Sequence, residues 1–237
     1  MLIADLPKLQ RVIDIRFNDP KLLREAMTHT SYATEFNLKY DNQRLEFLGD
    51  AVVQIILTKH LFHRYSGLQE GDLTKIRSAL VNQDSLAKFA RAISLGDYIL
   101  LGRGETDAHG SDRDSTLSDA FEALCGAIYL DQGAQSVTAF LLRILQENCE
   151  EPAELLRSMN PKGALQEYTQ GRYGKAPEYR TVTVSGPPHN PVYEVEVLVN
   201  GRLLGRGTAA KRKSAEQAAA SAALAAIRQD PNGDSGI

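Results

Sequence analysis

Four acidic side chains stand at helical spacing in mostly apolar sequence, and their chemistry is the most specific in the chain. Glu46 and Asp50 are four positions apart, and Asp119 and Glu122 are three apart. Residues at these separations share one face of an α-helix, so each pair sets two carboxylates side by side. Burying neighbouring like charges is costly unless a cation compensates them. The spacing therefore predicts a divalent-cation site.

The surrounding residue types indicate which ion would bind. The stretches 42–61 and 115–130, which carry the acids, offer no Cys or His at ligand spacing. A site made only of oxygen donors favours Mg²⁺ or Mn²⁺ over zinc. The alternative is that the acids are helix caps or solvated residues, an interpretation that two matched pairs make weaker than one pair would. His29 could be a ligand or an acid–base group, but a hydrogen-bonded structural role is favoured.

The composition is that of a globular protein with room for one or two domains. The chain has 237 residues, of which 43% are hydrophobic and 24% charged. Two cysteines, Cys125 and Cys149, make no disulfide framework and favour a reducing compartment, so we expect a cytoplasmic protein. The first residues lack a basic segment followed by an apolar one, and no apolar run reaches about 18 residues. We therefore expect neither a secretory signal nor a membrane-spanning helix.

The net charge of −3 conceals a division of the chain. Residues 1–160 carry a balance of −6, residues 161–229 a balance of +5, and the last eight residues −2. An acidic front part followed by a basic part predicts that the two parts interact differently with a polyanion.

The front part is expected to be an all-α domain over residues 1–152. The sequence predicts short helices within 5–28, with Asp19-Pro20 as a helix start, and a polar, irregular segment at 28–36. The expected elements after it are the first acidic helix, a helix over 72–93 with a break near Asn82, a turn at 95–105, an exposed loop at 106–115, the second acidic helix and an amphipathic helix over 135–149. Glu70 and Asp72 are explained by the preference for acids at a helix N-terminus.

The back part has the pattern of a small α+β domain. After an expected linker at 153–160, residues 161–229 read as helix, three strands and an alanine-rich helix, with Asn200-Gly201 predicting a hairpin. Residues 230–237 are expected to be a disordered tail.

Three consecutive cations predict a phosphate contact in the back domain. Lys211, Arg212 and Lys213 fall in the expected first turn of the last helix, where positive charge opposes the helix dipole. A phosphate would reverse that penalty, although a solvated cluster is the alternative. The loop 187–191 carries His189 between two strands, from where it could reach a groove.

The last 70 residues or so resemble a double-stranded-RNA-binding domain. The similarity lies in PKGALQEY, GPPHNPVY and GRGTAAKRKSAEQAAA. It implies that Gln166 and Glu167 touch one minor groove and His189 the next, with the three cations on the phosphates between them. Such domains read the shape of A-form RNA more than its sequence.

The front domain resembles bacterial ribonuclease III. NQRLEFLGDAV matches the family signature, and THTSYATE, EGDLTKIRSALV, LGRGE and SDAFEALCGAIYLD match other blocks. The resemblance implies that Glu46, Asp119 and Glu122 bind metal and that Asp50 is a catalytic carboxylate beside them. It also implies that Phe47 inserts into a partner subunit and that Glu70 is an accessory acid of the cleft.

The implied reaction is metal-dependent hydrolysis of double-stranded RNA. Mg²⁺ would activate water, no protein nucleophile would be needed, and the products would carry 5′-phosphate and 3′-hydroxyl ends. The resemblance also implies a homodimer through the front domain and a role in processing ribosomal RNA precursors and messenger RNA. No nucleotide cofactor is expected, because the chain lacks a P-loop motif.

One residue departs from the family pattern. Gln43 stands in NQRLEF where the family usually has Glu, and an amide carries no charge. With the four central acids intact, we expect catalysis to survive, while metal dependence or cleavage-site choice could change. Gln43 is also the one sequence feature that favours a rival function, a non-cleaving regulator that binds double-stranded RNA.

Overall fold

The computed structural model describes residues 5–148, 160–187 and 191–229. It divides the chain into two compact units, 1–150 and 151–237, and each is considered by itself. The predicted tail and all of the predicted linker except Asn160 lie outside the described residues.

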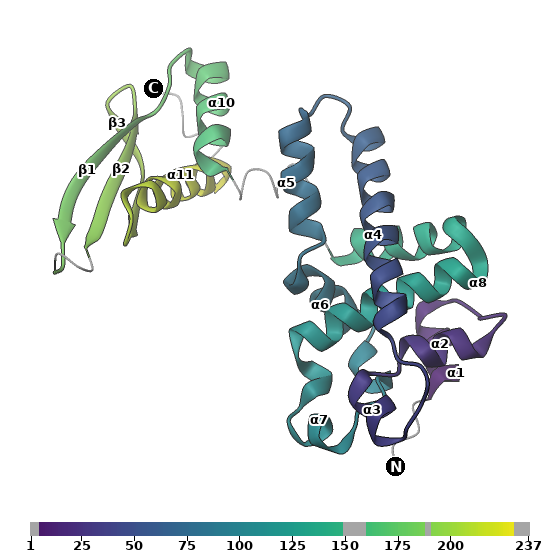
Figure 1. The fold of residues 1–237 in the computed structure, drawn as a ribbon. Helices are drawn as coiled ribbons and strands as arrows, with labels where there is room; N and C mark the ends of the chain where they lie inside the picture. The colour runs from purple at the N-terminus through teal and green to yellow at the C-terminus, as the bar shows by residue number, and fades with distance from the viewer. Residues whose placement is uncertain (1–4, 149–159, 188–190, 230–237) are drawn as a thin grey trace. The chain divides into compact units, whose positions relative to one another are not determined.

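The described part of the first unit is built from helices, as the sequence predicts (Figure 1). Its elements are α1 (Leu6–Ile13), α2 (Pro20–Ala26), α3 (Thr30–Glu35), α4 (Gln43–Arg64), α5 (Glu70–Leu80), α6 (Gln83–Ala92), η1 (Leu95–Tyr98), α7 (Arg103–Asp107), η2 (Gly110–Asp112) and α8 (Asp114–Asn148).

The core of this unit forms around α8, which packs mainly against α4 and α6. Phe121 of α8 lies between Phe89 of α6 and Phe140, with ring centroids 5.9 Å from each, and all three rings are buried. Gly133, with φ of 80°, breaks the helical backbone inside α8. The two helices predicted over 115–130 and 135–149 therefore join end to end at this kink.

Two predicted irregular segments contain helix. Residues 28–36 include α3, whose N-terminus is capped by His29, because its Nδ1 accepts a hydrogen bond from the Ser31 amide. The loop expected at 106–115 contains the end of α7, all of η2 and the first two residues of α8. Arg113, just before α8, forms an ion pair of 3.1 Å with Glu105 of α7. Periodicity reveals neither this cap nor this ion pair. Because both segments contain helical turns, both predictions of irregular structure are wrong.

Predictions based on caps and turns agree with the structure. Asp19 caps α2 and Pro20 is its first residue. Asn82 lies at the break between α5 and α6 and caps α6: its Oδ1 accepts a hydrogen bond from the Ser85 backbone N–H. Short polar side chains satisfy free backbone N–H groups at helix starts, which is why these boundaries can be read from sequence.

The second unit has the predicted order of helix, three strands and helix. Its elements are α10 (Pro161–Tyr173), β1 (Glu178–Ser185), β2 (Val192–Val199), β3 (Arg202–Ala209) and α11 (Arg212–Gln229). The strands form one antiparallel sheet in the order β1-β2-β3. Asn200 and Gly201 both have positive φ, 51° and 78°, as a tight hairpin turn between β2 and β3 requires.

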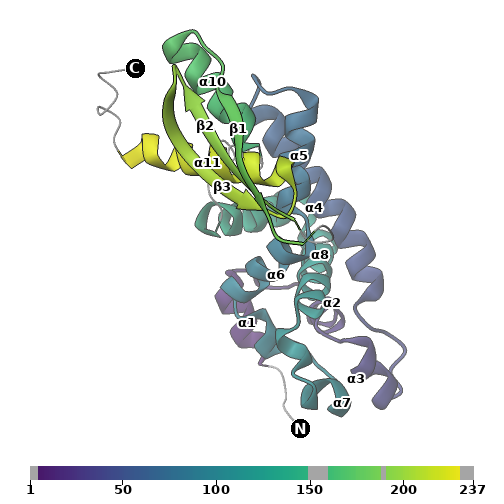
Figure 2. The same cartoon turned by 90° about the vertical axis from the view of Figure 1, so that its left-hand side faces the viewer.

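Both helices of this unit pack on one face of the sheet (Figure 2). The shared core consists of Leu165, Val195, Val197, Ala215, Ala219, Ala220 and Ala223. Gly205 and Gly207 of β3 have no room for a side chain, because a Cβ on either would collide with the backbone of α11. The alanine-rich sequence thus lets α11 lie directly on the strand.

Among the helices that the structure describes, none combines the length and the apolar character needed to cross a membrane.

Candidate active site

A close approach of two helices brings the acidic pairs together. Gly49 of α4 and Gly126 of α8 lie where the helices touch. A Cβ on Gly49 would collide with the carbonyl of Glu122, and one on Gly126 with the carbonyl of Leu45. Glu46 and Asp50 flank the first glycine, and Asp119 and Glu122 precede the second. The glycines therefore set the separation of the carboxylates, a role that the sequence analysis missed.

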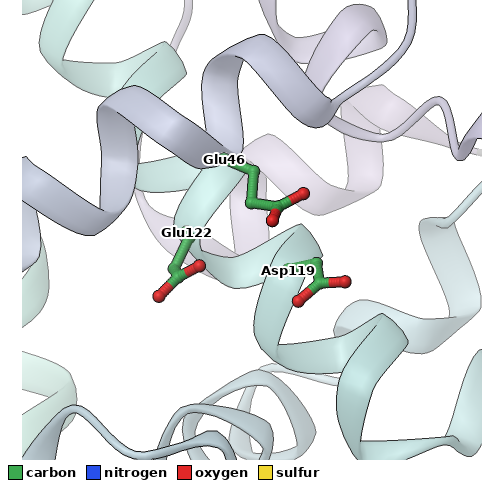
Figure 3. A group of neighbouring side chains, drawn as sticks. All are labelled: Glu46, Asp119 and Glu122. Carbon is green, nitrogen blue, oxygen red and sulfur yellow. The ribbon is translucent and has the colours of Figure 1, made fainter.

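Three of the four acids form one compact cluster, the acidic cluster Glu46, Asp119 and Glu122. One carboxylate oxygen from each lies within 4.8 Å of the other two, and all three residues are half-buried. In Figure 3 the side chain of Glu46 extends from α4 toward the same space as the two from α8. The structure thus brings together the three residues that the sequence analysis predicted as metal ligands.

The acidic cluster favours protonation when no cation is present. Burial raises the pKa of the Glu122 carboxyl to about 8, helped by the charges of Asp50, Asp119 and Glu46. Burial also raises the pKa of Glu46, as do the charges of nearby acids. The pKa of Asp119 is raised by burial too, against the opposing effects of a hydrogen bond from Ser118 and the nearby His29. Ionising all three acids together is therefore unfavourable without a positive partner.

A divalent cation fits this donor set. The acidic cluster is the one group of at least three acidic, His or Cys side chains with metal-binding spacing in the part of the chain that the structure describes. Its donors are all carboxylate oxygens, the preferred ligands of Mg²⁺ and Mn²⁺. Glu46, Asp119 and Glu122 would each offer one carboxylate oxygen to such an ion.

Asp50, the fourth acid, lies beside the acidic cluster without belonging to it. Its side chain is exposed, and its Oδ1 accepts a hydrogen bond of 2.7 Å from Nε2 of Gln54, one helical turn later. Its charge raises the pKa values of both Glu46 and Glu122. Asp50 therefore lies close enough to the acidic cluster to affect its ionisation.

The remaining predicted residues of this unit lie at helix starts or on the surface. Gln43 is the exposed first residue of α4, and its backbone N–H donates a hydrogen bond to Asp41 Oδ1 at 3.1 Å. Glu70 opens α5 and accepts a hydrogen bond from Thr74 at 3.0 Å, in keeping with the helix-acid interpretation. Phe47 is 83% exposed, an unusual place for a phenyl ring.

The predicted RNA contacts of the second unit are accessible where the structure describes them. Gln166 and Glu167 are exposed on α10 and line a shallow groove of about 510 Å³ together with Gly163, Gln170 and Gly171. Lys211, Arg212 and Lys213 are exposed, although α11 begins at Arg212, so Lys211 precedes the helix instead of lying in its first turn. His189 lies outside the described residues.

A half-buried acid that the sequence analysis missed joins the two helices of this unit. Glu216 of α11 accepts from Lys162 of α10 at 2.6 Å and from Arg212 at 3.1 Å. Lys162 also lies 4.4 Å from the ring centre of Tyr179. Hydrogen bonds from Lys162 lower the pKa of Glu216. Glu216 falls one helical turn after Arg212, a spacing that could have indicated the ion pair.

Known families account for both units. Residues 19–148 match the family described as ribonuclease-III-like, and residues 161–227 match the double-stranded RNA binding motif. The curated protein "Ribonuclease 3" of Symbiobacterium thermophilum is 47% identical over 208 residues, which are 88% of each chain. The "Ribonuclease 3" of Campylobacter jejuni is 40% identical over 94% of this chain and 97% of its own.

A solved structure supports the fold of the first unit. The crystal structure of the nuclease domain of ribonuclease III from Campylobacter jejuni has 41% sequence identity and a TM-score of 0.58, covering 62% of this chain and 97% of that one. Full-length similarity, two family matches and the acidic cluster agree: the chain belongs to the ribonuclease III family of endoribonucleases and carries a double-stranded-RNA-binding domain.

Proposed function

We propose that the protein hydrolyses phosphodiester bonds of double-stranded RNA with a divalent metal ion, leaving 5′-phosphate and 3′-hydroxyl ends. The observation that carries this proposal is the acidic cluster, three half-buried carboxylates within 4.8 Å in a chain that also has an RNA-binding domain. Mg²⁺ is the proposed ion, with Mn²⁺ as a substitute, because both bind oxygen donors.

The protein groups have separate tasks in this mechanism. Glu46, Asp119 and Glu122 would hold the metal, which when bound lowers the pKa of water and stabilises charge on phosphate oxygens. Asp50, exposed beside them, would orient the attacking water and accept its proton. Because water is the nucleophile, no covalent bond to the protein forms.

RNA binding is assigned to the second unit. Gln166 and Glu167 on α10, and His189, which lies between β1 and β2 in the sequence, would reach successive minor grooves. Lys211, Arg212 and Lys213 would contact the phosphates between them. The exposure and positive charge of these three basic residues support this assignment.

We further propose a homodimer through the first unit. Phe47, Ile55 and Phe62 of α4 are 83%, 63% and 64% exposed and lie within about 80° of one another around the helix axis. Tyr129 and Leu130 of α8 are exposed as well. Exposed apolar side chains along one face of α4 favour burial against a partner, and two copies would supply one acidic cluster for each RNA strand.

The proposed cellular role follows the family. Ribosomal RNA precursors and structured messenger RNAs, cut in the cytoplasm, are the proposed substrates. The one described cysteine, Cys125, is buried and unpaired, which suits a reducing compartment.

The test is cleavage of a labelled, perfectly paired RNA duplex with Mg²⁺, Mn²⁺, Ca²⁺ or no metal. Wild type should cut with Mg²⁺ or Mn²⁺ only. Glu122→Gln should lose about 10²-fold or more in kcat, because the metal supplies several kcal/mol of charge stabilisation, while retaining duplex affinity. The matched control is Glu147→Gln, the same change at an exposed site on α8, which should keep full activity.

The rival function predicts another result. A regulator would bind the duplex tightly and leave it intact with every metal, and Gln43→Glu would then be the variant to examine for restored cleavage. Cleavage by wild type without any metal would contradict the proposed mechanism.

A further inference from the structure

Gln54 is the residue that holds the fourth carboxylate in place. It lies one turn after Asp50 on α4, and its Nε2 donates to Asp50 Oδ1 at 2.7 Å. Gln54 is half-buried, so its side chain has less freedom than that of the exposed Asp50. A hydrogen bond to an ionised acceptor is stronger than one between neutral groups.

Asp50 needs such a support because of its neighbours. Asp50 lies one helical turn after Glu46 on the same face of α4, so the two carboxylates repel each other when both are ionised. This repulsion favours rotamers in which the exposed Asp50 side chain points away from Glu46. The hydrogen bond from the Gln54 side chain opposes this rotation, because it fixes one carboxylate oxygen of Asp50.

The type of donor is as important as its position. A lysine or arginine at residue 54 would also bind Asp50, but its charge would compete with a divalent cation for the carboxylates. A glutamate would add a further repulsion. A neutral amide donates a hydrogen bond and leaves the negative charge of the site unchanged.

We propose that Gln54 is a positioning residue that orients Asp50 toward the acidic cluster for catalysis and metal binding. The inference rests on the proposed function, since it assigns Gln54 a role through Asp50. Residues that orient groups around a metal typically change metal affinity or activity by about 10- to 100-fold when replaced.

The test compares Gln54→Leu, which keeps the side-chain bulk and removes the donor, with Gln146→Leu, the same change at an exposed site on α8. The readouts are kcat and KM for an RNA duplex, Mg²⁺ affinity by calorimetry without RNA, and the melting temperature. Gln54→Leu should lower kcat or Mg²⁺ affinity by about 10-fold or more, with KM for RNA and the melting temperature nearly unchanged. Gln146→Leu should resemble wild type in all four.

A double-variant cycle separates this inference from the function on which it rests. If Gln54 acts through Asp50, Gln54→Leu should add little to the loss of Mg²⁺ affinity or kcat caused by Asp50→Asn. Additive losses, or a Gln54→Leu protein equal to wild type in both readouts, would overturn the positioning role and leave the nuclease function standing. A wild type that binds Mg²⁺ without cutting RNA would contradict the function, and the calorimetric cycle would still decide the role of Gln54.

Discussion

The carboxyl group of Glu122 couples proton binding to metal binding. Its pKa of about 8 results first from burial and then from the charges of Asp50, Asp119 and Glu46. Near neutral pH the metal-free protein therefore holds a proton there, which a metal ligand must release. Mg²⁺ affinity should consequently increase as the pH rises toward 8.

The same shift predicts how stability depends on pH. Between the unfolded pKa of 4.5 and the folded value of about 8, Glu122 binds a proton in the folded state only, so the free energy of unfolding should fall as pH rises through this window. The slope from one proton is at most about 1.4 kcal/mol per pH unit. Calorimetric melting of metal-free protein from pH 5 to 8.5 should show a smaller decline for Glu122→Gln, and saturating Mg²⁺ should reduce the decline in wild type.

If metal-free wild type and Glu122→Gln lost stability in parallel over this range, the raised pKa of Glu122 would be contradicted. The exposed Glu147→Gln variant serves as the control, since it should follow wild type at every pH.

At the residue scale, helical spacing was enough to propose the acids but not their grouping. The spacing pairs Glu46 with Asp50, whereas the structure groups Glu46 with Asp119 and Glu122. Asp50 instead accepts a hydrogen bond from Gln54. Spacing along one helix reports which residues share a face. It carries no information on how a second helix crosses that face. The family resemblance implied the grouping, and the structure shows it.

At the scale of elements, the contact between α4 and α8 depends on Gly126. A methyl group at this position would meet the Leu45 carbonyl and the backbone nitrogen of Gly49, neither of which can rotate away. Alanine normally favours a helix over glycine by about 1 kcal/mol. Gly126→Ala should nevertheless lower the free energy of unfolding by about 1–3 kcal/mol, because overpacking forces the helices apart.

The measurement is denaturant unfolding together with Mg²⁺ affinity, which should also weaken as the carboxylates of the two helices separate. Gly104→Ala, in α7, is the matched control, because no atom lies within 4 Å of the added methyl group. A Gly126→Ala protein as stable as the control would show that the helices can move without cost.

The basic residues at the start of α11 make a prediction of their own. Each phosphate neutralised on duplex DNA contributes about 0.9 to the slope of log affinity against log salt. Replacing Lys211, Arg212 and Lys213 by Ala should therefore flatten the slope for an RNA duplex by about 2 to 3. The experiment is a salt series of binding without divalent metal, with Arg180→Ala of β1 as a control expected to change the slope by less than about 1. An unchanged slope in the triple variant would indicate a solvated cluster instead of a phosphate site.

Element boundaries could be predicted where one residue type decides them. Asp19-Pro20, Asn82 and Asn200-Gly201 each satisfy a local backbone requirement that depends on no distant contact. The segment with α3 was missed because its cap is a histidine, an uncommon capping residue. Its place is fixed by long-range bonds such as the one from the Gly102 amide to Ser31, which no local pattern encodes.

At the scale of the whole molecule, the charge division separates two tasks. The front part, with a balance of −6, carries the acidic cluster, and residues 161–229, with +5, carry the proposed RNA contacts. A polyanion is attracted by the second unit and opposed by the first until a cation neutralises the carboxylates. Cleavage should therefore need metal even where binding does not. The charge balance alone predicted only that the two parts would interact differently with a polyanion.

The proposed dimer depends on an aromatic side chain that is mostly exposed within one subunit. Phe47 is 83% exposed and adjoins Glu46 of the acidic cluster, so its burial by a partner would link assembly to the site. Large aromatic side chains at interface centres typically contribute about 2 kcal/mol or more to association. Phe47→Ala should therefore raise the dimer dissociation constant by about 30-fold or more, measured by sedimentation equilibrium.

Phe47→Ala should also change the cleavage activity. At protein concentrations below the new dissociation constant, the variant should lose double-strand cleavage and should regain it as concentration rises. Val12→Ala, which truncates an apolar residue on α1 that is 39% exposed, should leave both measurements unchanged. A wild-type protein that sediments as a monomer at micromolar concentration while cutting both strands would contradict the dimer, and each acidic cluster would then have to cut the two strands in successive binding events.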